Sequence, residues 1–368
     1  MLIGVYLRSS AARNGFFTAS MTDDRPANPF RDLEPYTRED RASFFGRDSD
    51  LTLVLDRVLT RRTTLLFAGS GVGKTSFLEA RVIPEVENRY FAASCRQWAG
   101  GPPVGLMRGS IVAEWNHSPW RPQDAPPPPP EGEGQGALAG FYRYCRPLLS
   151  RDCSGALLIL DQFEEVFHQN ADTPELAVLI DALCELINAP TPDVRVLFSM
   201  REEFLGYLGV FDNRIPDLFN NYYRLRNPTR RQAHSIIANT IALEGVEPSE
   251  ALDDLINDLA LAPQHIGVQP RLATALRDSI PLPFLQIACH GLWDRQFDGQ
   301  ATEGPPEDRD RTRTPTWHPG MYRHANRRAF PPDTGPATPS STCNRTAGGR
   351  SGVSPMGSRT CCRRHWAS

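Results

Sequence analysis

Lysine is almost absent from this sequence. Of its 40 lysine and arginine residues, only Lys74 is a lysine. A chain that uses arginine for nearly all of its positive charge does not need a single lysine for solubility. A lysine ammonium is a compact point charge, whereas an arginine guanidinium is a planar fork, so the two are not interchangeable where an anion is held. Lys74 is therefore the first candidate functional residue.

Several features of other protein classes are also missing. The eight cysteines form no C-x-x-C pair and no regular framework, which argues against structural zinc and against a disulfide-stapled secreted fold. The apolar run at residues 2–7 is too short for a secretory signal or a membrane span. A net charge of −3 disfavours a general nucleic-acid-binding role. We expect a cytoplasmic protein without a membrane segment.

The last part of the chain lacks the residues that build a core. Residues 299–368 contain no leucine, no isoleucine and one valine, Val353. Such a segment cannot bury enough apolar surface to offset the entropy lost on ordering. We expect residues 298–368 to be a disordered, non-homologous tail, for which a frameshift is one origin. Residues 1–27 are expected to be a disordered extension, with Met21 as an alternative start to Met1.

Lys74 lies in a glycine-rich segment between an apolar run and a helix-like segment. Residues 68–75 read A-G-S-G-V-G-K-T, which follows the phosphate-loop pattern G-x-x-x-x-G-K-[ST] except that Ala68 replaces the first glycine. In such a loop, backbone N–H groups and the lysine hold phosphates, and the hydroxyl meets Mg²⁺. Thr75 is thus an expected Mg²⁺ ligand. The residues expected to bind the nucleotide are Gly69, Ser70, Gly71, Val72, Gly73, Lys74, Thr75 and Ser76.

A second apolar run, Ala156–Leu160, is followed by an acidic residue. This residue, Asp161, is expected to hold Mg²⁺ through water. Glu164 and Glu165 come shortly after it, and a carboxylate beside the γ-phosphate can polarise a water molecule for hydrolysis. Either glutamate is a candidate base. The alternative is that both acids only favour the start of the next helix through its dipole.

A third apolar run, Val194–Met200, leads directly into Arg201. Ligands of parallel sheets lie beyond the carboxyl ends of the strands. Arg201 is therefore expected to point at the phosphates, where it would sense or stabilise charge on the γ-phosphate. The alternative is a local ion pair between Arg201 and Glu202 or Glu203.

Eight short segments carry a family resemblance: Asn28–Arg31, Phe44–Asp48, Gly73–Thr75, Leu160–Phe167, Arg195–Phe204, Tyr222–Leu225, Pro283–Cys289 and Leu292–Asp294. In combination they resemble the novel STAND NTPases, which are signal-transduction ATPases with numerous domains. The resemblance covers residues 28–296. It implies a switch that binds ATP, or GTP, with Mg²⁺ and whose hydrolysis reorients a core and a lid. It also implies that Phe45, Gly46 and Arg47 line the pocket for the base and sugar.

The order of these segments predicts an α/β fold, with a P-loop NTPase parallel sheet sandwiched by helices and followed by a small helical lid domain. The sheet domain is expected over residues 28–229, with a helix at 39–62. Prolines predict an exposed insertion at about 100–136. Helix-spaced apolar residues predict the lid over residues 230–297.

Two other functions remain open. If Ala68 marks a degenerate loop, the protein is a non-catalytic nucleotide-binding scaffold or the inactive remnant of a larger sensor. Nucleic-acid binding through the arginine-rich tail is disfavoured by the overall acidity and by the lack of interleaved aromatic residues. The expected partners are the nucleotide and unidentified proteins, including further copies of the chain in a nucleotide-dependent oligomer.

Overall fold

The computed structural model describes residues 17–19, 27–128, 137–149, 151–171, 173–190, 193–261 and 278–298. The predicted tail beyond residue 298 and most of the predicted extension at 1–27 lie outside these ranges. In the part of the chain that is described, no helix combines the length and the apolar character needed to cross a membrane.

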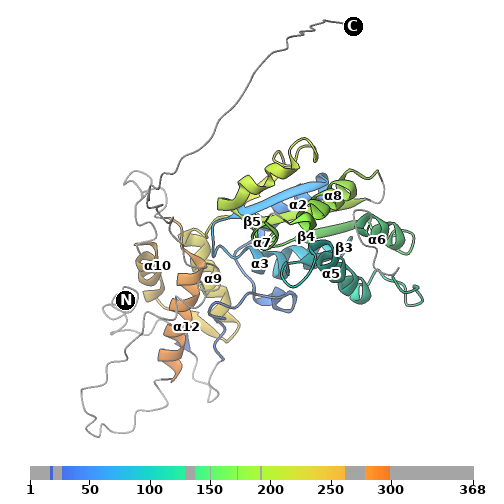
Figure 1. The fold of residues 1–368 in the computed structure, drawn as a ribbon. Coiled ribbons are helices and arrows are strands. Elements are labelled where there is room, and N and C mark those ends of the chain that lie inside the picture. The colour runs from blue at the N-terminus through green and yellow to red at the C-terminus, as the bar shows by residue number, and fades with distance from the viewer. Residues whose placement is uncertain are drawn as a thin grey trace, which may run out of the picture. The chain divides into compact units, whose positions relative to one another are not determined.

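Five parallel strands form the central sheet (Figure 1), in the order β3-β4-β5-β2-β6. They are β3 (Phe91–Cys95), β4 (Ala156–Leu160), β5 (Val194–Arg201), β2 (Thr63–Ala68) and β6 (Tyr222–Arg224). Strand β5 lies between β2 and β4, and Ala68 at the end of β2 pairs with Arg201 at the end of β5. The predicted parallel sheet is confirmed, and its order brings the carboxyl ends of β2, β4 and β5 together.

The sheet has a hydrophobic core on each face, because alternate side chains of a strand point to opposite sides. In β4, Leu157 and Ile159 join one core and Leu158 and Leu160 join the other. The first core holds α2 (Asp48–Thr60) and the helical segment after the P-loop, made of α3 (Lys74–Phe77), the π-helical η2 (Leu78–Val82) and α4 (Ile83–Val86). The second core holds α5 (Pro103–His117), α6 (Ala137–Cys145), α7 (Glu164–Asn170), α8 (Pro174–Asn188) and the 3-10 helix η3 (Glu202–Phe211).

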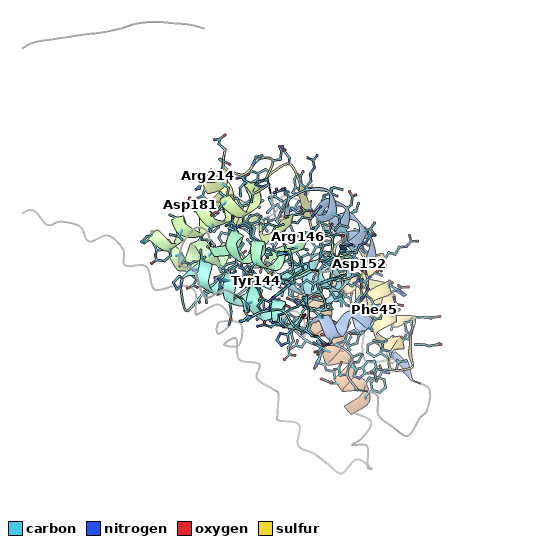
Figure 2. All side chains as sticks on the ribbon, turned by 90° about the vertical axis from the view of Figure 1, so that its right-hand side faces the viewer. Phe45, Tyr144, Arg146, Asp152, Asp181 and Arg214 are labelled. Carbon is cyan, nitrogen blue, oxygen red and sulfur yellow. The ribbon has the colours of Figure 1, made fainter. Side chains whose placement is uncertain are left out.

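An ion pair between Arg214 and Asp181 ties the loop after η3 to α8. The two side chains lie next to each other in Figure 2, at a distance from Phe45.

Two local expectations are wrong. The predicted helix at 39–62 is broken into the 3-10 helix η1 (Arg38–Ser43) and α2, because Gly46 between them has a left-handed φ of 79°. Part of the predicted exposed insertion at 100–136 is instead the buried helix α5, whose Met107 and Trp115 are 0 % exposed. Its proline is the first helical residue, where proline is tolerated.

A separate core joins α9 (Arg230–Ala242), α10 (Ala251–Leu261) and α12 (Leu282–Asp298), the helices of the predicted lid. Strand β1 (Phe17–Ala19) pairs with β7 (Val246–Pro248) in antiparallel fashion. Phe17 is 3 % exposed and lies 5.2 Å from Trp293 between ring centroids. Residues 17–19 are therefore not part of a disordered extension, because Phe17 completes the lid core.

Candidate nucleotide-binding site

The P-loop joins the end of β2 to the start of α3. Gly71 and Gly73 have φ angles of 77° and 85°, in the left-handed region that glycine enters without steric cost. Ala68 is the last residue of β2 and its side chain is fully buried in the core beneath the loop. Alanine therefore suits this position, and the missing first glycine does not make the loop degenerate.

Thr75 and Asp161 meet at the carboxyl edge of the sheet. Thr75 Oγ1 donates to Asp161 Oδ2 at 2.7 Å, and Ser199 Oγ donates to Asp161 Oδ1 at 2.7 Å. Trp98 Nε1 donates to the main-chain carbonyl of Asp161 at 2.8 Å. Mg²⁺ prefers oxygen ligands and is usually held by one or two carboxylates plus water and phosphate. The hydroxyl of Thr75 and the fixed carboxylate of Asp161 fit such an ion.

No carboxylate of the described residues forms an ion pair with Lys74. Its Nζ donates to the carbonyl of Ala68 at 3.4 Å, and none of the ion pairs in the described part of the chain involves it. Burial lowers the pKa of Lys74, while the nearby Glu164 and Asp161 carboxylates raise it. A partly desolvated ammonium of this kind is suited to an anionic ligand, because charge-assisted hydrogen bonds are the strong ones.

Of the two candidate bases, the structure brings Glu164 to the site. Glu164 Oε1 lies 3.3 Å from Arg201 Nε, and Oε2 accepts a hydrogen bond from the Arg201 backbone N–H at 3.3 Å. The side chain of Glu164 is 2 % exposed. Burial raises the pKa of Glu164, while backbone hydrogen bonds and the charges of Lys74 and Arg201 lower it. Glu165 is half-buried, and the described contacts do not join it to this group.

Arg201 makes neither of the local ion pairs considered as alternatives. Glu202 pairs instead with Arg224, at 2.8 Å between its Oε2 and Arg224 Nε. Arg201 turns to Glu164, yet its side chain remains 46 % exposed. It therefore lies at the strand ends with a guanidinium accessible to solvent.

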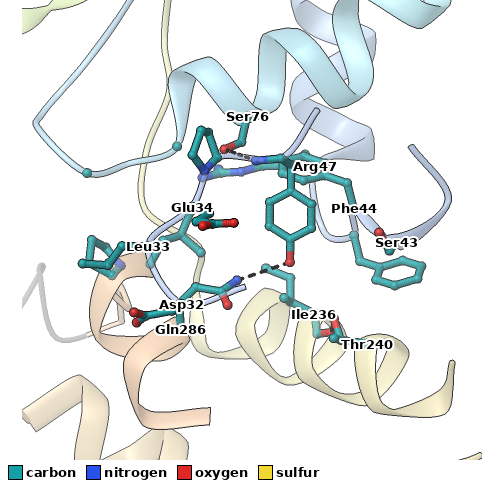
Figure 3. A pocket seen from close by; sticks show the side chains of 17 residues that line it. Asp32, Leu33, Glu34, Ser43, Phe44, Arg47, Ser76, Ile236, Thr240 and Gln286 are labelled. Carbon is teal, nitrogen blue, oxygen red and sulfur yellow. Dashed lines mark hydrogen bonds between the residues drawn. The ribbon is translucent and has the colours of Figure 1, made fainter. Parts of the chain in front are cut away.

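A pocket of about 240 Å³ opens beside the P-loop (Figure 3). Its walls come from residues 32–36 and 43–47, from the loop, and from the lid helices α9 and α12. The polar side chains that line it include those of Tyr36, Ser43, Arg47, Ser76, Thr240 and Gln286, and Ile236 lies among them.

Phe45 and Arg47 line this pocket, and Gly46 lies between them. The guanidinium of Arg47 is already occupied: it donates to the carbonyl of Val72 at 3.0 Å and to that of Arg226 at 2.7 Å, and it pairs with Asp50. Arg47 therefore holds the P-loop through the carbonyl of Val72, and its described hydrogen bonds go to protein groups.

Four residues of the site were missed from the sequence. Ser199 gave a signal, since it is a hydroxyl inside an otherwise mostly apolar strand. Trp98, Tyr36 and Gln286 gave none. The last two make a contact across 250 positions of the chain, which no local pattern reports.

The sequence model of the family described as Novel STAND NTPase 1 matches residues 29–304. A search of curated proteins gave no match. Among solved structures, the Walker-type ATPase PABY2304 of Pyrococcus abyssi is 13% identical with a TM-score of 0.47, over 73% of this chain and 75% of that one. The ADP form of the Aeropyrum pernix ORC2 protein is 15% identical with a TM-score of 0.36, over 75% and 73%. Cdc6p of Pyrobaculum aerophilum is 15% identical with a TM-score of 0.37, over 69% and 62%. Similarities this low say nothing about function.

Proposed function

Because this chain belongs to the novel STAND NTPase 1 family, we propose that it binds ATP, or GTP, with Mg²⁺ and acts as a nucleotide-dependent switch. The observation that carries the proposal is the 2.7 Å hydrogen bond between Thr75 and Asp161 beside Lys74, which forms no ion pair with the described residues. The backbone amides of residues 69–74 and the Lys74 ammonium would hold the phosphates, and Thr75 and Asp161 would hold the metal. Bound Mg²⁺ supplies charge neutralisation on the phosphate oxygens.

Glu164 is the proposed general base, and hydrolysis is proposed to be slow. A carboxylate with a raised pKa accepts protons more readily near neutral pH than an ordinary one does. The buried Glu164 has this property. Its ion pair with Arg201 opposes the uptake of a proton, which is a physical reason for slow turnover.

The lid is the proposed moving part. Helices α9 and α12 share the pocket with the P-loop, so a ligand that fills the pocket touches both the sheet domain and the lid. A ligand shifts an equilibrium only through contacts that differ between two states, and a pocket of this kind provides them. A cytoplasmic setting and protein partners, among them further copies of the chain, belong to the same proposal.

The first experiment measures binding of a fluorescent ATP analogue to the full chain with Mg²⁺. Replacing Lys74 by alanine should weaken binding roughly 10- to 150-fold, since a charge-assisted hydrogen bond contributes about 1.5–3 kcal/mol. The matched control is Arg61→Ala, which removes an exposed cation and should bind as the wild type does. Equal affinity in Lys74→Ala and the wild type would overturn the P-loop assignment.

The second experiment compares ATP turnover in Glu164→Gln and Glu165→Gln. Loss of a general base costs about 10²- to 10⁴-fold in rate, and we expect this loss for Glu164→Gln with binding retained. Glu165→Gln should hydrolyse ATP normally. The opposite result assigns the base to Glu165, and a wild type that binds ATP without turning it over supports the scaffold alternative.

A further inference from the structure

Tyr36 links two walls of the pocket, and dashed lines in Figure 3 mark the hydrogen bonds at Ser76 and Gln286. The backbone N–H of Tyr36 donates to Ser76 Oγ at 3.2 Å, and its hydroxyl accepts from Gln286 Nε2 at 3.4 Å. Ser76 belongs to helix α3, which directly follows the P-loop, whereas Gln286 belongs to lid helix α12. The amide of Gln286 is thereby held at the edge of the pocket by one of its two polar atoms.

The other polar atom of this amide, Gln286 Oε1, is buried and has no hydrogen-bond partner among the described residues. An unpaired buried acceptor is destabilising, and native structures rarely retain one without a use. The terminal torsion of glutamine is soft. The carbonyl can therefore turn toward a ligand in the pocket without any movement of the backbone.

Three polar groups around this amide already donate to protein acceptors, whereas the hydroxyls of Tyr36 and Ser76 accept in the bonds described above and keep a hydrogen to donate. Thr240 Oγ1 donates to the carbonyl of Ile236 at 2.7 Å, and Ser43 Oγ donates to that of Asp40 at 3.1 Å. The guanidinium of Arg47 is used by protein acceptors. The buried Gln286 Oε1 is an acceptor without a donor among the described residues, so a base that enters the pocket is recognised at this atom through a group that donates.

We propose that Gln286 reads the 6-amino group of an adenine base, with Tyr36 as the residue that positions the glutamine. The inference rests on the proposed function, and it specifies ATP where that proposal leaves GTP open. Guanine carries a carbonyl in place of the 6-amino group, so its O6 and Gln286 Oε1 would be two acceptors facing each other without a hydrogen between them. Gln286 is thus a specificity-determining residue contributed by the lid.

The test compares the affinities of the full chain for ATP and for purine riboside triphosphate, which lacks the 6-amino group. The wild type should prefer ATP about tenfold, since one neutral hydrogen bond contributes about that factor. Gln286→Leu, or Gln286→Met if the leucine variant does not fold, should bind the two nucleotides equally. Tyr36→Phe should reduce the preference only in part. The control Arg295→Leu replaces an exposed residue of the same helix, and it should keep the preference.

Three results would overturn the inference: a wild type without preference, a Gln286→Leu variant that keeps the preference, or GTP bound more tightly than ATP. Inorganic tripolyphosphate with Mg²⁺ separates this failure from failure of the proposed function. If tripolyphosphate competes with the ATP analogue in both the wild type and Gln286→Leu, the phosphate site stands and only the base-reading role is lost. If it competes in neither, and Lys74→Ala also has no effect, the proposed function itself is wrong.

Discussion

The phosphate end and the base pocket of the same site are built in different ways. The phosphate end lies at the ends of three adjacent strands, where Ser199 belongs to β5, Asp161 follows β4, and Lys74 and Thr75 begin helix α3 after β2. The base pocket is closed by the lid helices and by residues 32–47. The first is positioned mainly by the sheet and its cores, whereas the second exists only when the lid is folded and in place. The two ends should therefore respond differently to the same damage.

The largest effect is expected from Phe17→Ala, which damages the lid core. Truncating a buried phenylalanine costs about 3–5 kcal/mol, and Phe17 packs between Phe30 and Trp293. Hydrogen exchange should show loss of protection in α9 and α12 but not in the strands of the sheet. ATP affinity should fall while tripolyphosphate affinity holds.

The control for this variant is Phe219→Ala, whose side chain is 44 % exposed and whose loss should change stability by less than about 0.5 kcal/mol. Deleting residues 1–20 should reproduce the effect of Phe17→Ala. If neither change alters the lid, β1 is not part of its core.

The sequence predicts the residues of the phosphate end better than those of the base pocket. The glycine-lysine loop, Asp161 and Arg201 follow apolar runs whose strand assignment is confirmed, because ligands of parallel sheets lie at strand ends. The choice between Glu164 and Glu165 could not be made, since both lie at the start of one helix and only tertiary packing separates them. The pair Tyr36 and Gln286 could not be predicted, because its two members lie 250 positions apart in the chain.

Gly46→Ala is expected to damage the base pocket more gently. Gly46 has a φ of 79°, and a Cβ there would lie 2.4 Å from Cγ1 of Ile236 on α9. Overpacking of this kind costs about 1–3 kcal/mol, and it should push the lid away from the loop. Isothermal titration should show weaker ATP binding with tripolyphosphate binding unchanged.

A double-mutant cycle checks that the cause is this contact. In an Ile236→Ala background the steric part disappears, so Gly46→Ala should cost less than it does alone. Equal costs in both backgrounds would assign the effect to backbone strain at residue 46 instead.

Ser199→Ala is the corresponding test at the phosphate end. It removes the hydrogen bond to Asp161 Oδ1 and leaves the sheet and lid intact. We expect Mg²⁺-dependent ATP affinity to fall about tenfold, which corresponds to about 1.4 kcal/mol, with little change when Mg²⁺ is withheld. Ser110→Ala, in which a helix serine bonded to its own backbone is removed, is the control. A loss of equal size without Mg²⁺ would show that Ser199 does not act through the metal ligand.

The smallest effect concerns the stability of the ligand-free protein, in which the partly buried ammonium of Lys74 is destabilising. Burial lowers the pKa of Lys74 below its usual value of 10.5. Between the folded-state pKa and 10.5, the unfolded chain binds more protons than the folded one, so stability rises with pH across that window. Below the window the full cost of burying the ammonium is present. Lys74→Met should therefore melt slightly higher than the wild type at pH 7, and the difference should shrink as the pH rises through the window.

Saturating Mg²⁺ and ATP should reverse this order, because a ligand that binds only the folded state adds stability in proportion to the logarithm of its concentration over Kd. The wild type gains this stabilisation and Lys74→Met does not. Thermal melts with and without nucleotide, at pH 7 and at alkaline pH, measure both parts. A ligand-free Lys74→Met variant that melts below the wild type at pH 7 would mean that the ammonium is already neutralised by Glu164 and Asp161. The phosphate end would then be satisfied without its ligand, which is the opposite of what the lone 3.4 Å contact to Ala68 indicates.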